Sequence, residues 1–294
     1  MILELSVAKP YDFAQSVCDH GWVQLAPCYW DKERQALRHV QCLGTGKVAL
    51  LHISAENTAD VVTLRIEVEA DTPLTTAEQD DVRQNVHWML KLDEDFSAFY
   101  ERIHQHPPLQ ERMSSGRGRL LRSPTLFEDV VKTITTTNTT WRQTIGMVER
   151  IVNTLGEPYP ANPELRAFPT PQQVAAADDA VFTGVLKLGY RGPYVQQLAR
   201  EIVTGERDLE SLKHSDLPPQ ELRKELKQIK GVGDYAANTL LMILGRYGEL
   251  AVDSEVRSLV SRLYFNGEAV TEAQIQDTYR HWDEWKYLAY WFDA

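Results

Sequence analysis

Residues 226–257 read LKQIKGVGDYAANTLLMILGRYGELAVDSEVR, and this stretch is the most informative part of the chain. Its polar first part predicts the end of a helix, and Gly231-Val232-Gly233 follows as a turn. Glycine accepts a positive φ and allows close backbone approach, so the two glycines predict a tight connection. Apolar residues at helical spacing predict the next helix over residues 234–245. The backbone N–H groups at the start of that helix should therefore point outward, which is an arrangement that seats a phosphate.

The hairpin, the small residues Ala236 and Ala237, and Asp253 about one helix later together resemble the motif of the helix-hairpin-helix (HhH-GPD) DNA glycosylases. The likeness covers nearly the whole chain. An α+β front, then SSGRGRLLRSPTLFEDVVKTITTTNTTWRQTIGMVERIV, then LGYRGPYV and the hairpin follow an order similar to the 3-methyladenine and 8-oxoguanine glycosylase branch. The resemblance implies a helical body of two subdomains that binds duplex DNA containing a damaged base.

The chain as a whole predicts an α+β fold, with an antiparallel sheet ahead of a mostly helical body. Residues 48–53 and 61–70 have the β-branched content and alternation of half-buried strands. We therefore expect an α+β domain over residues 1–90 and a helical HhH-GPD glycosylase domain over residues 91–294, with the hairpin at 226–245. The expected helices span residues 76–91, 96–103, 126–135, 142–155, 171–177, 178–186, 194–204, 219–229, 253–264 and 271–294, and residues 156–170 are expected to be a loop.

Composition places the chain among ordinary globular proteins. It has 294 residues, of which 43% are hydrophobic and 25% are charged. No apolar stretch approaches the ~20 residues of a membrane-spanning helix. The start MILELSVAKPYDF lacks the basic and apolar regions of a signal peptide. We expect a monomeric, cytoplasmic and nucleoid-associated enzyme with no membrane partner.

The net charge of −11 is awkward for a DNA-binding protein, since neutralised phosphates normally supply much of the affinity. Binding depends on where the basic residues lie, and two groups of them stand out. The first is Arg112, Arg117, Arg119 and Arg122, and the second is Arg223, Lys224, Lys227 and Lys230. Each group is either part of a local DNA-binding surface or an ordinary solvated face.

The cysteines argue against a metal or cluster site. Cys18, Cys28 and Cys42 are odd in number and have no C-x-x-C spacing. Some relatives carry an iron–sulfur cluster on four cysteines near the C-terminus, and this chain has none there. We expect no cofactor, apart from a structural Na⁺ or K⁺ ion that the resemblance implies at the hairpin. Its ligands would be the backbone carbonyls of Lys227, Ile229 and Val232.

Asp253 is the candidate catalytic residue. Cleavage of an N-glycosidic bond develops positive charge on the sugar, and a fixed carboxylate can stabilise that charge and orient the attacking water. The alternative is a helix N-cap, which an Asp before Ser-Glu-Val-Arg fills well. Both roles can hold together.

Tyr235 departs from the relatives that also cut the DNA backbone. The resemblance places a lysine there, which attacks the sugar and forms a Schiff base, and a tyrosine cannot do this. The chain is therefore expected to use water as nucleophile and to leave an abasic site. In 3-methyladenine glycosylases an aromatic ring at this place stacks on a cationic base. The alternative is simple packing between helices.

Extrusion of a nucleotide requires side chains that fill the gap left in the duplex. The resemblance matches Asn138 and the pair Tyr190-Arg191 to these residues. The alternatives are a helix cap at Asn138 and a turn aromatic over the core at Tyr190. The expected hairpin contacts to DNA are Gly231, Gly233 and Lys230.

The C-terminal helix adds two candidates for the base pocket. Trp291 stands where an 8-oxoguanine glycosylase closes its pocket with an aromatic ring. Tyr287 replaces an amide that reads the base edge there, and Glu255 replaces a histidine near the phosphate. These two departures favour excision of alkylated purines, such as 3-methyladenine or 7-methylguanine, over excision of 8-oxoguanine. The alternatives are a glycosylase for oxidised or deaminated bases and a catalytically silent lesion-binding protein.

Overall fold

The structure is a computed structural model that describes residues 1–113 and 116–293, apart from the side chains of Pro108 and Arg112. It forms two compact units. Unit 1 comprises Met1–Asp93 and Arg119–Glu210, and unit 2 comprises Glu94–Gly118 and Ser211–Ala294. The boundary expected near residue 90 separates two domains, which are parts that fold independently. The compact units do not test independent folding, so this boundary stays a prediction.

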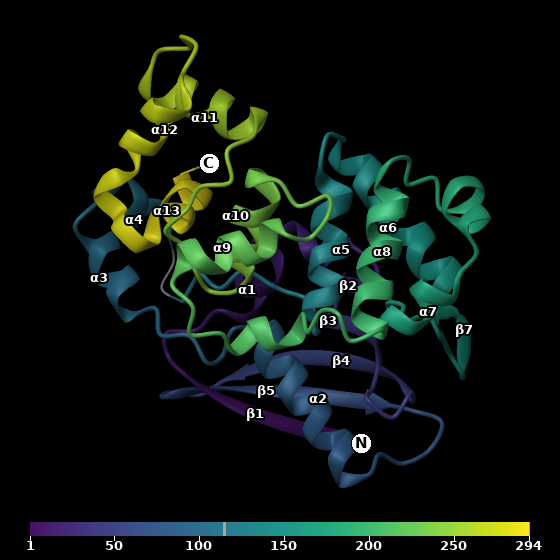
Figure 1. The fold of residues 1–294 in the computed structure, drawn as a ribbon. Coiled ribbons are helices and arrows are strands. Elements are labelled where there is room, and N and C mark those ends of the chain that lie inside the picture. The colour runs from purple at the N-terminus through teal and green to yellow at the C-terminus, as the bar shows by residue number, and fades with distance from the viewer. Residues whose placement is uncertain (114–115, 294) are drawn as a thin grey trace. The chain divides into compact units, whose positions relative to one another are not determined.

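Unit 1 contains a five-stranded antiparallel sheet of order β1-β5-β4-β3-β2. The alternation in β5 buries Val62, Leu64 and Ile66 on one face, as the sequence predicted. The α+β class, with an N-terminal antiparallel sheet followed by helices, is therefore confirmed (Figure 1). The strands span Ile2–Ala8 (β1), Cys28–Asp31 (β2), Ala36–Cys42 (β3), Val48–Asn57 (β4) and Val61–Glu69 (β5).

The helices of unit 1 begin at side-chain caps. Helix α2 lies against the sheet (Figure 1) and starts with a capping box between Thr75 and Glu78. Thr140 and Gln143 form another capping box at the start of α6. The helices span Phe13–Cys18 (α1), Thr76–Met89 (α2), Leu126–Thr136 (α5), Trp141–Leu155 (α6), Pro171–Ala176 (α7) and Arg191–Val203 (α8).

Unit 2 is helical and packs around aromatic side chains. The rings of Phe96, Phe99 and Tyr247 all lie within 6 Å of the Trp285 ring, centroid to centroid. The helices span Ser97–His104 (α3), Pro107–Arg112 (α4), Pro219–Lys227 (α9), Asp234–Ile243 (α10), Ser254–Tyr264 (α11), Glu272–Thr278 (α12) and Lys286–Asp293 (α13). No helix in the described part of the chain is both long and apolar enough to cross a membrane.

The prediction of one helix over residues 271–294 is wrong, and Ala294 lies outside the described residues. A 3₁₀ segment, Arg280–Trp285, separates α12 from α13. Asp283 has φ 47° there, which ends regular helix, and its carboxylate pairs with Arg102 at 2.9 Å. That partner is far away in the sequence, so the periodicity of the segment could not predict the break.

Short elements account for the other differences. The loop predicted at residues 156–170 contains a hairpin of β6 (Pro158–Tyr159) and β7 (Asn162–Arg166). Strands β1 and β2 and helix α4 were not predicted. The segment expected as a helix over residues 178–186 contains a π-helical turn at Val181–Val185. Helix α8 begins at Arg191, three residues before its predicted start.

Unit 1 buries ionisable side chains that set its pH dependence. The His20 ring stacks on Trp22, and its Nδ1 lies 2.5 Å from the Leu121 carbonyl oxygen. Burial lowers the pKa of His20 to about 4 and that of His39 to about 3. Burial also raises the pKa of Asp129 to about 6, which acts in the opposite direction.

We predict that replacing His20 by Asn flattens the dependence of unfolding free energy on pH. Between pH 4 and 6.5 the unfolded chain binds a proton at His20 that the folded chain does not, so stability falls as the pH falls through this window. One such proton changes the slope by up to about 1.4 kcal/mol per pH unit. Urea titrations at several pH values measure this slope, and an unchanged slope in the variant would contradict the burial of a neutral His20.

Candidate active site

The hairpin joins α9 to α10 within unit 2 (Figure 1). Gly231 has φ 94°, in the region that favours glycine, while Gly233 has φ −90° and ψ −167°, which any residue adopts. A Cβ added at Gly233 would meet no atom within 4 Å. Of the two hairpin glycines, only Gly231 has the expected positive φ. Gly233 has no side chain, so a ligand could come close to the backbone at the start of α10.

The basic side chains of the hairpin are neutralised locally. Asp234 is the first residue of α10, and its Oδ1 lies 2.6 Å from Lys227 Nζ and 2.6 Å from Arg223 Nη2. The hydrogen bond from Lys227, together with the charges of Lys227 and Arg223, lowers the pKa of Asp234. Lys230 is exposed beside the turn. The predicted basic group is thus partly an internal ion-pair cluster.

The backbone expected to hold a monovalent cation has a suitable donor set. The Val232 N–H donates to the Ile229 carbonyl at 3.0 Å, which uses one of the two lone pairs of that oxygen. Within the described residues, the carbonyls of Lys227 and Val232 accept no backbone hydrogen bond across the turn. The three carbonyls fit a hard cation, and this role stays a prediction.

Asp253 is the N-cap of α11. Its Oδ1 accepts hydrogen bonds from the Glu255 and Val256 N–H groups, each at 2.9 Å. In residues 1–113 and 116–293, its Oδ2 has no hydrogen-bond partner. The cap therefore fixes the carboxylate through one oxygen and leaves the other available, as the dual role requires.

Aromatic residues of the predicted base pocket lie near this carboxylate. Burial raises the pKa of Tyr287, and nearby Tyr235, Tyr290 and Asp253 add to the effect. The pKa of Tyr290 is raised as well, mainly by burial and next by the negative charge of Asp253. The rings of Tyr287 and Trp291 stack with centroids 6.0 Å apart and planes 17° apart. Unit 2 thus gathers Asp253, Tyr235, Tyr287 and Trp291, together with Tyr290, which the sequence prediction did not assign to the pocket.

Tyr287 is less accessible than expected of a residue that reads a base edge. Only 3% of it is exposed, so little of its surface can meet a base. Half-buried Trp291 and Tyr235 are the more accessible rings of the cluster.

The other predicted DNA contacts meet in unit 1. Asn138 has φ 47° and is exposed in the turn between α5 and α6, and its Nδ2 donates to the Tyr190 hydroxyl at 3.1 Å. Tyr190 is 49% exposed. Hydrogen bonds to Thr137 and Asn138 lower the pKa of Tyr190 despite partial burial, and the Arg191 charge adds to this effect. Two exposed polar tips thus stand together at this turn.

Arg191 stabilises the turn between α5 and α6 through its buried guanidinium. It is 7% exposed, and its guanidinium donates to the carbonyls of Thr137 and Asn138. The guanidinium also lies 4.5 Å from the centre of the Tyr190 ring. In this structure it positions Asn138 and Tyr190, and its predicted direct contact with DNA remains untested.

The first basic run is neither a DNA-binding surface nor a solvated face at two of its positions. Arg122 is 2% exposed and lies 3.3 Å over the Trp88 ring, and its Nε donates to the Trp88 carbonyl. Arg119 is also buried and donates to the Lys91 carbonyl at 3.2 Å. In unit 2, the Arg117 guanidinium lies 5.1 Å over the Phe292 ring. The side chain of Arg112 lies outside the described residues.

Metal ligands are not grouped in the described part of the chain, where no three His, Cys, Asp or Glu side chains come together as a metal site would require. The three cysteines are free.

We predict that substitution by alanine changes the free energy of unfolding differently at the two hairpin glycines. Gly231→Ala should lower the free energy of unfolding by about 1–2 kcal/mol, because Ala resists a positive φ. Gly233→Ala should leave it unchanged or slightly raise it, because the backbone is extended and the added Cβ has open space. Denaturant unfolding compares the pair, and equal losses would contradict this hairpin geometry.

Comparison with known proteins agrees with the resemblance. Residues 131–284 match the family described as HhH-GPD superfamily base excision DNA repair protein. An endonuclease III from Sulfolobus acidocaldarius is 23% identical over 155 residues, which cover 53% of this chain and 64% of that protein. The chain thus matches slightly less than two thirds of the length of this curated relative.

Solved structures with the same fold extend over the whole chain. A 3-methyladenine DNA glycosylase from Archaeoglobus fulgidus has a TM-score of 0.76 and 21% identity, covering 100% of this chain and 97% of its own. The Clostridium acetobutylicum 8-oxoguanine glycosylase/lyase in complex with double-stranded DNA has a TM-score of 0.70 and 19% identity, covering 100% and 96%. At these identities the likeness shows the fold alone. Because the family match spans more than half of the sequence, this chain belongs to the HhH-GPD superfamily of base excision DNA repair proteins.

Proposed function

We propose that this protein is a monofunctional DNA glycosylase that removes alkylated purines, such as 3-methyladenine or 7-methylguanine, from duplex DNA. The observation that carries the proposal is Asp253, whose carboxylate is fixed through one oxygen beside a cluster of aromatic rings. Family membership supports a role in base excision, and the substrate is inferred from the site itself.

Asp253 supplies the electrostatic part of the reaction. As the glycosidic bond breaks, positive charge develops on the sugar, and a preorganised carboxylate stabilises it without having to reorient. The two N–H groups that hold Oδ1 also fix the direction of Oδ2. Oδ2 can then accept a hydrogen bond from the water that attacks the sugar.

The aromatic rings match a cationic leaving base. A purine alkylated at a ring nitrogen carries positive charge, which an aromatic face attracts. Because this base leaves as a neutral molecule, it needs little help from an acid. Tyr235 and Trp291 are the half-buried rings available for stacking, and the hydroxyl of buried Tyr287 stays neutral.

The side chains support hydrolysis without a lyase step. A lyase of this kind needs an amine that attacks the sugar, and position 235 holds a phenol. The nearby amine of Lys227 is paired with Asp234 at 2.6 Å. Water is then the nucleophile, and an abasic site is the product.

Excision of an oxidised base such as 8-oxoguanine is the second candidate. The stack of Trp291 on Tyr287 favours it, since an aromatic lid at this place suits a planar neutral base. Burial of Tyr287, which is only 3% exposed, argues against its use in reading a base edge.

We predict that Asp253→Asn lowers release of 7-methylguanine from alkylated duplex DNA by at least about 100-fold. The free energy of unfolding should change by less than about 0.5 kcal/mol, because Asn caps helices about as well as Asp. Base release is followed by chromatography, and unfolding by urea titration. Asp12→Asn is the matched control, because Asp12 caps α1 through the Gln15 N–H at 3.0 Å.

Assays of the parent and of Asp253→Asn on alkylated and on oxidised duplex DNA distinguish the alternative functions. Equal activity in Asp253→Asn and the parent would remove Asp253 from the mechanism. Release of 8-oxoguanine but not of 7-methylguanine would establish the second candidate, and a covalent adduct trapped by borohydride would overturn the monofunctional assignment. Lesion binding without release of any base would show a silent binding protein.

We predict that Asp234→Asn strengthens binding to undamaged duplex DNA several-fold. The substitution frees Lys227 and Arg223 from their shared carboxylate, and each cation that then meets a phosphate steepens the log–log salt dependence by about 0.9. Fluorescence anisotropy at several salt concentrations measures both effects. Asp60→Asn removes the same charge at an exposed turn of the sheet, and an equal gain there would show that only net charge matters.

A further inference from the structure

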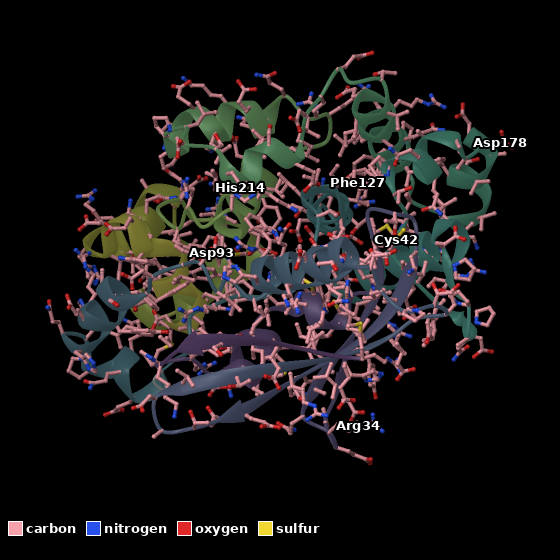
Figure 2. The ribbon with its side chains drawn as sticks, turned by 90° about the horizontal axis from the view of Figure 1, so that it is seen from below. Arg34, Cys42, Asp93, Phe127, Asp178 and His214 are labelled. Carbon is pink, nitrogen blue, oxygen red and sulfur yellow. The ribbon has the colours of Figure 1, made fainter. Side chains whose placement is uncertain are left out.

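Trp141 is the most exposed tryptophan of the chain, and the proposed reaction gives it no role. It is 36% exposed, whereas each of the other six tryptophans is buried or half-buried in the described structure. It is the first residue of α6, directly after the turn that carries Asn138. This turn follows α5, the helix that contains the labelled Phe127 in Figure 2 and ends at Thr136.

Two contacts fix the Trp141 side chain. Its Nε1 donates to Gln24 Oε1 at 3.1 Å, and its ring lies nearly parallel to that of Trp22, with centroids 6.5 Å and planes 20° apart. Trp22 is itself buried, stacks on His20 at 4.3 Å and donates to Asp129 at 2.7 Å. The Trp141 ring therefore packs on a fixed neighbour, and its exposed part lies away from Trp22.

Gly21 makes room for this ring. A Cβ added at Gly21 would lie 2.7 Å from Trp141 Cζ2, which is closer than real Cβ contacts allow. The φ of Gly21 is not positive, so its backbone does not require glycine, and the ring is what excludes a side chain. A single exposed apolar residue needs no explanation, but a hydrogen-bonded, stacked ring beside a glycine that makes room for it indicates a built position.

The surroundings of Trp141 suit nucleic acid. Residues 130–148 contain no Asp or Glu, although the whole chain has a net charge of −11. Arg142 is exposed, and its side chain has no hydrogen bond or ion pair with any described residue. Asn138 is three residues from Trp141, a reach of at most about 11 Å, which corresponds to about three nucleotide steps of 3.4 Å. A duplex held at Asn138 would therefore place bases within reach of Trp141.

We propose that Trp141 is a further DNA-contacting residue, whose ring stacks on a base that has lost its neighbour because a nucleotide has been extruded. Every base has a flat face, so this contact recognises the gap in the duplex and not the surrounding sequence. A ring that is already fixed loses little side-chain freedom on binding. The inference rests on the proposed function only in that the protein extrudes a nucleotide, and all residues that carry it belong to unit 1.

Fluorescence anisotropy with the full chain and two duplexes tests the proposal. One duplex contains tetrahydrofuran, a stable abasic analogue, and the other is intact. Trp141→Ala should weaken binding to the abasic duplex at least about fivefold, the lower end of what one base stack contributes, and change binding to the intact duplex less than about twofold. Trp141→Leu, which keeps apolar bulk without an aromatic face, should lose as much, whereas Trp141→Phe should retain most of the affinity. Tyr29→Ala removes an exposed ring from β2 and is the matched control, which should change neither affinity.

Gly21→Ala displaces the ring without removing it. Because the added Cβ meets Trp141, this variant should also weaken binding to the abasic duplex, and adding it to Trp141→Ala should cause no further loss. Thermal unfolding of each variant is measured in parallel. Equal losses on both duplexes together with a lower melting temperature would show that Trp141 has only a structural role, and would overturn the proposal.

Two further outcomes would also overturn the proposal. These are unchanged affinity of Trp141→Ala for the abasic duplex, and a parent that does not prefer the abasic duplex to the intact one. Binding to tetrahydrofuran requires no base release, so the two proposals fail separately. A parent that releases 7-methylguanine but binds abasic DNA independently of Trp141 would overturn this inference alone. A Trp141-dependent preference for abasic DNA in a protein that releases no alkylated purine would overturn the proposed function alone.

Discussion

The N-cap at Asp253 is the constraint on which the proposed chemistry depends. A helix start leaves backbone N–H groups without partners, and a capping carboxylate satisfies them at a gain of about 1 kcal/mol. Here Oδ1 accepts both the Glu255 and Val256 N–H groups, so the carboxylate cannot rotate freely. Catalysis by electrostatic stabilisation requires such a fixed charge. The same two hydrogen bonds thus stabilise α11 and hold the carboxylate that we propose to be catalytic.

Charge in this protein is balanced locally, which explains how an acidic chain can carry a DNA-binding motif. The net charge is −11, yet the hairpin cations Lys227 and Arg223 meet one carboxylate on their own surface. The buried arginines of unit 1 are likewise used internally, on Trp88 and on backbone carbonyls. The contacts predicted at the hairpin backbone and at Asn138 and Tyr190 do not depend on a broad basic surface.

Much of the fold could be predicted because its long elements are strongly periodic. The β4–β5 pair, α2, α5, α6 and the hairpin all follow from alternation, helical spacing, caps and glycines. The break at Asp283 could not be predicted from the periodicity of residues 271–294, and Arg102, which pairs with Asp283, lies 181 residues away. The β6–β7 hairpin is too short for its own pattern to be recognised within a proline-rich segment.

In the candidate site too, features set by neighbouring residues could be predicted, whereas those set by contacts far away in the sequence could not. The motif predicted Asp253 and its cap, and the structure bears out the cap at the level of individual hydrogen bonds. The sequence could not show that Arg191 points inward to the Thr137 carbonyl, because an arginine after an exposed tyrosine looks like a DNA contact. It also could not show that Arg119 and Arg122 are buried. Arg119 donates to a carbonyl just after α2, and Arg122 donates to a carbonyl in the last turn of α2. Charge patterns predict composition, and only the fold decides which charges reach the surface.

The aromatic cluster near Asp253 contains two tyrosines whose hydroxyls carry no charge beside the carboxylate. Burial and neighbouring negative charge raise the pKa of Tyr287 and Tyr290, so both hydroxyls stay neutral at physiological pH. Neutral phenols do not repel the carboxylate or compete with it for positive charge. Positive charge on a sugar beside Asp253 would then be attracted to this one fixed carboxylate. A lysine at position 235 would instead place a second charge there and lower this field, so a tyrosine at this position suits an enzyme that relies on the carboxylate and water alone.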